Sequence, residues 1–138
     1  MLGDEIATYL AGAGLGLTLS SSGTQVYGVP FPAEAPDTAA CVIEYGGLAP
    51  YDAFGPSLSA PVFERPRFQI VCRDAQDRIA ACRALILAVE KTLRHFSGTM
   101  GAVTYGFVQA LGPPSFLKFD ESRRPHYVCN FQMTKVES

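Results

Sequence analysis

Residues 65–98 read RPRFQIVCRDAQDRIAACRALILAVEKTLRHFSG, and this stretch decides the fold. Its first part, residues 65–73, alternates in a way that predicts a half-buried β-strand. One face carries Phe68, Ile70 and Cys72, and the other carries Arg67, Gln69, Val71 and Arg73. Pro66 is tolerated because it stands at the start of the strand.

The second part, residues 75–96, has the period of a long amphipathic helix. Apolar side chains recur every three or four positions, at Ile79, Cys82, Ile86, Val89 and Leu93. Asp74 is the expected N-cap, and Gly98 is expected to stop the helix. Such a helix needs a partner for its apolar stripe, and the preceding strand offers one.

Shorter elements flank this unit. Residues 2–13 predict a short helix with Asp4 and Glu5 in its first turn. Strands are expected at residues 25–29, 41–45, 102–111 and 126–136. The last one alternates, with Tyr127, Cys129, Phe131 and Met133 on one face. The order α-β-β-β-α-β-β predicts a single α+β domain over residues 1–138. Its sheet should be mostly antiparallel, with the long helix and the short N-terminal helix packed on it.

Glycine and proline interrupt the chain between the second and third expected strands. The stretch at about residues 46–64 shows no period, so a long loop is expected there. Loops of more than about a dozen residues in small domains tend to be functional or mobile. We expect this one to reach a neighbouring protein, with Tyr51 and Phe54 as anchors.

The composition favours a domain that associates. Of the 138 residues 48% are hydrophobic and 17% charged, and the mean hydropathy is +0.14. A low charged fraction is typical of a subunit whose surface is partly covered by neighbouring subunits. The net charge of −2 provides no basic field for wrapping nucleic acid.

The sequence also predicts where the protein resides. No positive segment precedes an apolar run at the start, and the longest apolar run, residues 84–89, is far shorter than the ~20 residues of a membrane span. We therefore expect neither a secretory signal nor a contact with membranes. Four separated cysteines without a C-x-x-C pair favour a reducing compartment.

Motifs for catalysis, cofactors and metals fit poorly. Leu17 stands where the third glycine of a dinucleotide fingerprint should fall after Gly12 and Gly14. The two histidines, His95 and His126, form no ligand cluster with the cysteines. We expect no enzyme activity, no cofactor and no metal.

Arginine and aromatic residues remain as candidates for contacts with other proteins, because both are enriched at interfaces. These candidates are Tyr51, Phe54, Phe63, Arg65, Arg67, Arg73, Arg123 and Arg124. The alternative is that they form ordinary solvated strand edges and a loop folded onto its own domain.

Three segments together resemble one known family. They are DEIATYL at residues 4–10, ERPRFQIVCR at residues 64–73 and DESRRPHYVCNF at residues 120–131. They are similar to segments of the small minor capsid or tail-terminator proteins of long-tailed bacteriophages and of related gene transfer agents. The resemblance covers most of the chain, and its motifs are structural rather than catalytic.

The resemblance implies a structural virion protein that forms a homohexameric ring on the tail tube. The ring would halt tube growth and present a surface to the head connector or stopper protein. Its other partners would be the major tail tube protein and DNA passing non-specifically through the lumen. The protein would be assembled in the host cytoplasm and reside at the head-proximal end of the tail.

Two alternatives remain open beside that interpretation. One is a head-completion or connector protein, also called a minor capsid protein, that faces the portal. The other is a small-molecule-binding α+β domain with a pocket between sheet and helix.

Overall fold

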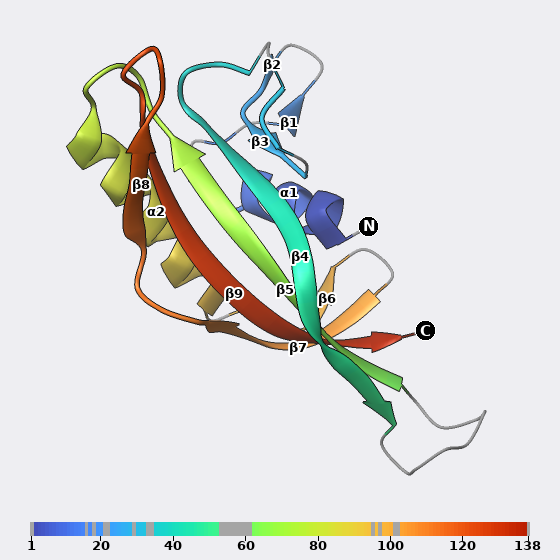
Figure 1. Ribbon diagram of the computed structural model, residues 1–138. Coiled ribbons are helices and arrows are strands. Elements are labelled where there is room, and N and C mark those ends of the chain that lie inside the picture. Colours follow the sequence, from blue (N-terminus) through green and yellow to red (C-terminus); the bar gives the residue numbers. More distant parts are fainter. Residues whose placement is uncertain are drawn as a thin grey trace.

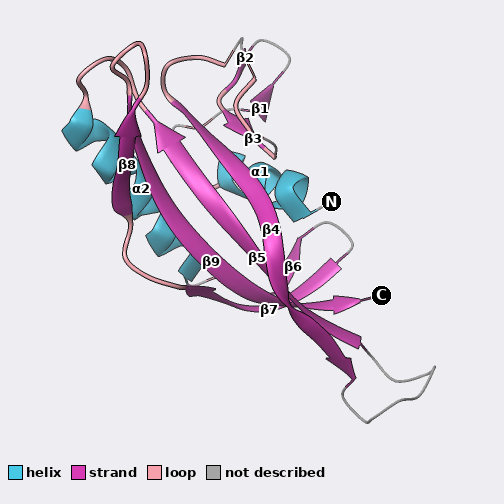
Figure 2. Ribbon diagram, viewed as in Figure 1, coloured by secondary structure: helices cyan, strands magenta, loops and turns pink. Residues whose placement is uncertain are grey.

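The computed structural model describes residues 2–15, 17, 19–20, 23–28, 30–32, 35–52, 62–94, 96, 98–100 and 103–137. Its elements are α1 (Leu2–Ala11), β1 (Leu19–Ser20), β2 (Gly23–Thr24), β3 (Val26–Tyr27), β4 (Ala39–Asp52), β5 (Val62–Arg73), α2 (Ile79–Arg94), β6 (Gly98–Met100), β7 (Val103–Ala110), β8 (Ser115–Phe119) and β9 (Pro125–Glu137). Both helices lie behind one face of a twisted sheet (Figures 1 and 2). The predicted α+β class and the order of the main elements are confirmed, and β1, β2, β6 and β8 are additional short strands.

The sheet has seven strands in the order β3-β4-β5-β9-β7-β6, with β8 also beside β9. Pairing is antiparallel throughout except between β3 and β4, so the expected mostly antiparallel sheet is confirmed. β9 is the central strand. One of its edges pairs with β5, while the other pairs first with β8 and then with β7.

The core lies between the sheet and the two helices. The alternation predicted for β5 and β9 is confirmed, because the helix-facing side chains are buried. They are Phe68, Ile70 and Cys72 on β5, and Tyr127, Cys129, Phe131 and Met133 on β9. From the helices, α1 adds Ile6, Ala7 and Leu10, and α2 adds Cys82, Ile86, Val89 and Leu93. Among the described residues, no helix is long and apolar enough to cross a bilayer.

The long helix begins later than the sequence predicts. Asp74 accepts hydrogen bonds from the Ala75 N–H and the Thr38 hydroxyl instead of capping a helix at Ala75. Asp77 follows with a φ of 58°, a left-handed conformation that α-helical residues do not adopt. The regular helix therefore begins at Ile79, whose side chain is 42% exposed rather than part of the buried stripe.

The loop expected at about residues 46–64 is in large part a β-hairpin. β4 continues to Asp52 and β5 begins at Val62, with Leu48 opposite Arg65 and Tyr51 opposite Phe63. The register shifts on both sides of Leu48, where the glycines and Pro50 fall. A bulge leaves residues out of the ladder, so a proline there costs no hydrogen bond. Residues 53–61 lie outside the described residues.

Ile86 tests the core that α2 forms with the sheet. Its side chain is fully buried, so Ile86→Ala should lower the free energy of unfolding by about 2–5 kcal/mol through the cavity that it leaves. Urea unfolding measures this loss. Leu87→Ala is the control on the same helix, since Leu87 is 37% exposed and should cost less than about 1 kcal/mol. Equal losses at the two positions would contradict this orientation of the helix.

Candidate assembly surface

The four cysteines lie in the interior as free thiols. Burial raises the pKa of Cys41, Cys82 and Cys129 to about 11, and it also raises the pKa of Cys72 well above its ordinary value. Protonated thiols are poor nucleophiles and poor metal ligands, so here they act as small apolar side chains. In the part of the chain that the structure describes, no three His, Cys, Asp or Glu side chains gather as a metal site would require.

The sheet face opposite the helices carries a polar network. Asn130 Oδ1 accepts hydrogen bonds from the Tyr45 hydroxyl and from Gln69 Nε2, both at 3.2 Å. Arg67 Nε donates to Gln132 Oε1 at 3.1 Å. These bonds link β4, β5 and β9 across the open face. Arg67, a predicted contact residue, is therefore half-buried and partly engaged within its own sheet.

Arg73 is another predicted contact residue, and the structure places it inside the molecule. Its side chain is hydrogen bonded to the backbone carbonyls of Ala35, Pro36 and Asp37, and the guanidinium lies 4.5 Å from the Phe31 ring centre. Only 5% of the residue is exposed. Arg73 fixes the segment before β4 onto β5, so it has no free surface to offer and is no longer a candidate for assembly.

Asp120 organises the turn between β8 and β9. Its Oδ1 accepts hydrogen bonds from the backbone N–H groups of Ser122 and Arg124, at 2.9 and 3.0 Å. Its Oδ2 accepts one from Arg124 Nε at 2.8 Å and lies 3.2 Å from His126 Nε2. The Asp120 side chain is only 17% exposed. The turn is thus held rigidly by one side chain.

Two further predicted contact residues fasten this turn to its surroundings. Arg123 pairs with Asp77 at 3.0 Å, and its guanidinium carbon lies 5.7 Å from the Phe119 ring centre. Arg124 extends from Asp120 to Asp37, at 3.2 Å. Arg123 remains 65% exposed and Arg124 24% exposed, so Arg123 presents the larger free surface.

Acid should destabilise the protein through this turn. Burial alone would raise the pKa of Asp120, but hydrogen bonds from the Arg124 N–H, His126, the Arg124 side chain and the Ser122 N–H hold it far below its ordinary value of 3.8. Because the folded state has the lower pKa, this stabilisation is present above pH 3.8 and is lost as the pH falls below it. Urea unfolding between pH 6 and pH 2 should show the loss, which Asp120→Asn should reduce.

His126 contributes an earlier, separate loss. Burial lowers its pKa below 6.5, and this outweighs the opposing effect of Asp120. The neutral ring is favoured in the folded state, so protonation costs stability as the pH falls below 6.5. The free energies of unfolding of the wild type and of Asp120→Asn should therefore be compared below pH 4. Parallel profiles of the two proteins there would contradict the role of Asp120.

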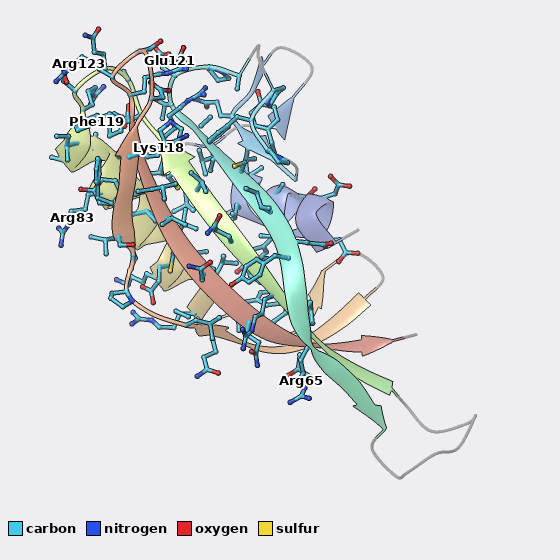
Figure 3. All side chains as sticks on the ribbon, in the orientation of Figure 1. Arg65, Arg83, Lys118, Phe119, Glu121 and Arg123 are labelled. Carbon is cyan, nitrogen blue, oxygen red and sulfur yellow. The ribbon has the colours of Figure 1, made fainter. Side chains whose placement is uncertain are left out.

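The exposed large apolar side chains come mainly from α2 and from β8 with the connection before it. Seven are found among the described residues, and six of the seven lie on α2, on β8 or in the connection before β8. These six form what we call the α2–β8 surface: Ile79, Leu87, Leu111, Phe116, Leu117 and Phe119. Figure 3 shows Phe119, Lys118 and Arg83 on this side and Arg65 at the other end of the sheet. Clustered exposed apolar side chains mark sites of protein contact.

The candidates on the far part of the hairpin are only partly described. Tyr51 and Phe63 lie opposite each other in the ladder, but their side chains lie outside the described residues, as does the whole of Phe54. Arg65 is half-buried near the same end. The structure thus separates the candidates: Arg65 and the paired ends of β4 and β5 lie at one end of the sheet, and the β8–β9 turn with Arg123 lies at the other (Figures 1 and 3).

A solved structure of another protein contains a chain with the same fold. A chain in a solved structure described as "Virion of native gene transfer agent (GTA) particle" has a TM-score of 0.63 and 18% sequence identity to this one. The similarity covers 96% of this chain and 94% of that chain, so the two share a fold. No curated protein matches the chain.

A family model gives the assignment. The model described as "Bacteriophage tail terminator protein" matches residues 9–137, which is nearly the whole sequence and all of the sheet. The resemblance to this family noted from the sequence is thereby confirmed over residues 9–137. The chain belongs to the bacteriophage tail terminator family.

Proposed function

We propose that this protein closes the head-proximal end of a phage-type tail tube as a ring of identical subunits. The observation that carries the proposal is the family match over residues 9–137. The shared fold with a chain of a gene transfer agent virion supports a particle of that kind as the setting. The action is structural: the ring stops addition of tube subunits by occupying the surface to which the next layer would bind.

The ring is proposed to contain six copies and to contact two further proteins, the major tail tube protein and the head connector or stopper protein. A closed ring requires two different faces on each subunit, and the low charged fraction of 17% suits a chain covered on both. DNA would pass through the lumen without sequence recognition. Assembly would take place in the host cytoplasm.

The end of the β4–β5 hairpin is proposed to make the contact with the tube or the connector. It carries Tyr51, Phe54 and Phe63, with Arg65 and Arg67 beside it. A hairpin that extends past the helices, as Figure 2 shows for β4 and β5, can reach a protein above or below the ring. Tyr51→Ala combined with Phe54→Ala should weaken binding to tubes while leaving the thermal unfolding temperature unchanged.

Purified protein mixed with tail tubes, and imaged by electron microscopy, tests the function. We expect ring-shaped density at one end of each tube and tubes that no longer lengthen when tube protein is added. Density inside the portal collar of whole particles, with none at the tube end, would favour the head-completion alternative. A protein that leaves the tubes bare and growing would contradict both.

A further inference from the structure

The two lateral sides of the sheet carry opposite charges. On one side, α2 and β8 bear four exposed cations, Arg83, Lys91, Arg94 and Lys118, and a single half-buried anion, Glu90. On the other side, α1, β3 and residues 39–45 of β4 bear the anions Asp4, Glu5 and Glu44 and no cation. We call the second group the α1–β4 surface. Such a separation is notable in a chain whose net charge is only −2.

These sides lie at opposite edges of the sheet. β3 and β4 stand at one end of the strand order, whereas β8 flanks β9 toward the other. In Figure 1, α1 and α2 correspondingly lie behind the two lateral parts of the sheet, with β8 on the α2 side. A contact that joins one edge to the opposite edge of the next copy is heterologous, and repeated rotation closes such contacts into a ring.

β8 supplies an exposed apolar edge for this contact. All five of its residues are exposed, and among the described residues it pairs only with β9. Phe116 and Phe119 lie in contact with each other, with ring centres 5.1 Å apart, and each is more than 40% exposed. Arg123 lies 5.7 Å from the Phe119 ring centre, and Lys118 belongs to the same strand. Exposed aromatic rings next to cations fit an interface in which an apolar centre is bordered by a polar rim.

We propose that the α2–β8 surface of one copy docks on the α1–β4 surface of a second copy of this chain. The apolar side chains of β8 form the centre of the contact, and Arg83 and Lys118 face Asp4 and Glu44 of the neighbouring copy. The proposal rests on the ring proposed above and identifies which two sides of the subunit form its seam. Opposite charges also orient the copies, since the cations of α2 and β8 on two copies repel each other.

Charge reversal tests this pairing. One variant combines Arg83→Glu with Lys118→Glu, and a second combines Asp4→Lys with Glu44→Lys. Each should weaken self-association at least tenfold, both in solution and on tail tubes, as measured by analytical ultracentrifugation and electron microscopy. A third variant with all four reversals should regain most of the wild-type association. An equimolar mixture of the first two should also assemble, because each then meets a complementary neighbour.

The mixture gives a further readout. Its copies must alternate around the ring, so only rings with an even number of subunits can close. Glu121→Lys is the control, since this exposed residue of the β8–β9 turn lies on neither surface by our definition and its change should leave association intact. Thermal unfolding checks that every variant folds. If a charge-reversal variant fails to fold, the variant Arg83→Gln with Lys118→Gln gives the same test, with a smaller expected loss of self-association.

The outcomes separate the seam from the ring. Suppose that the wild type forms rings on tubes. If the reversal variants then associate as well as the wild type, or if the fourfold variant stays dissociated, the seam is overturned and the proposed function stands. A wild-type protein that never self-associates, with or without tubes, would overturn both. We expect each variant that is reversed on one side to lose self-association. We expect the fourfold variant and the mixture to regain it.

Discussion

Phe68→Ala is expected to lower the free energy of unfolding by about 3–5 kcal/mol. Phe68 is fully buried on the helix side of β5 and stacks on Phe131 of β9, with ring centres 5.2 Å apart and an angle of 13° between the rings. The alanine removes the whole ring, and the paired strands cannot close the cavity without breaking their ladder. A loss of this size is a large part of the stability of an ordinary domain.

Phe116→Ala is the matched control for this prediction. It removes the same ring from the same sheet, but Phe116 is 45% exposed and should cost less than about 1 kcal/mol. Urea denaturation measures both free energies of unfolding, with the same dependence on urea concentration assumed for the two variants. A double variant of Phe68 and Phe131 should lose less than the sum of the two single losses, because the second truncation enlarges an existing cavity. Similar losses at Phe68 and Phe116 would place the core elsewhere.

Asp120→Ala is expected to cost about 3 kcal/mol. The substitution leaves two backbone N–H groups and the Arg124 guanidinium without the carboxylate that now accepts their hydrogen bonds. Hydrogen bonds to a charged group are stronger than neutral ones, and losing the acceptor strands several donors at once. The β8–β9 turn should loosen, so amide exchange at Ser122 and Arg124 should accelerate along with the loss of stability.

Glu121→Ala controls for the removal of an acidic side chain from the same turn. Glu121 is exposed, so its loss should change the unfolding free energy by no more than about 0.5 kcal/mol. Asp120→Asn should fall between the two alanine variants, because the amide keeps one acceptor oxygen but loses the charge. If Asp120→Ala proved as mild as Glu121→Ala, the turn would be held by its backbone alone.

Periodicity was sufficient for the parts of the fold that face the core. Alternation in β5 and β9 correctly assigned Phe68 and Phe131 to the buried face, and the steps of three and four placed Ile86 inside. These assignments follow from local geometry alone, since period 2 and period 3.6 are properties of the backbone. The same signals allowed the α+β class to be predicted before any contact was known.

Elements without such a period were missed for identifiable reasons. β8 has all its residues exposed, so its sequence shows no alternation, and it follows two prolines that suggest a break. The extension of β4 contains glycines and Pro50, which are typical of loops and are accommodated here by bulges. The left-handed conformation of Asp77 could not be predicted, because aspartate is also common in the first turn of helices.

The candidate site divides in the same way. Arg73 looked like a surface residue because its partners are backbone carbonyls more than 30 positions earlier, which no local pattern reveals. The α2–β8 surface needed the pairing of β8 with β9 before its apolar residues could be seen as one group. Only the general expectation of an associating subunit, drawn from the low charge, came from composition.

The central position of β9 has a consequence for the timing of biogenesis. Every strand that β9 joins is synthesised before it, so β5 waits on one side and β7 and β8 wait on the other until β9 emerges from the ribosome. Sheets closed by such distant pairings fold slowly compared with helical proteins. Until β9 pairs with them, β5, β7 and β8 keep unpaired edges, and such edges favour aggregation. The interval before β9 emerges is therefore the stage at which a nascent subunit is most exposed to misassembly.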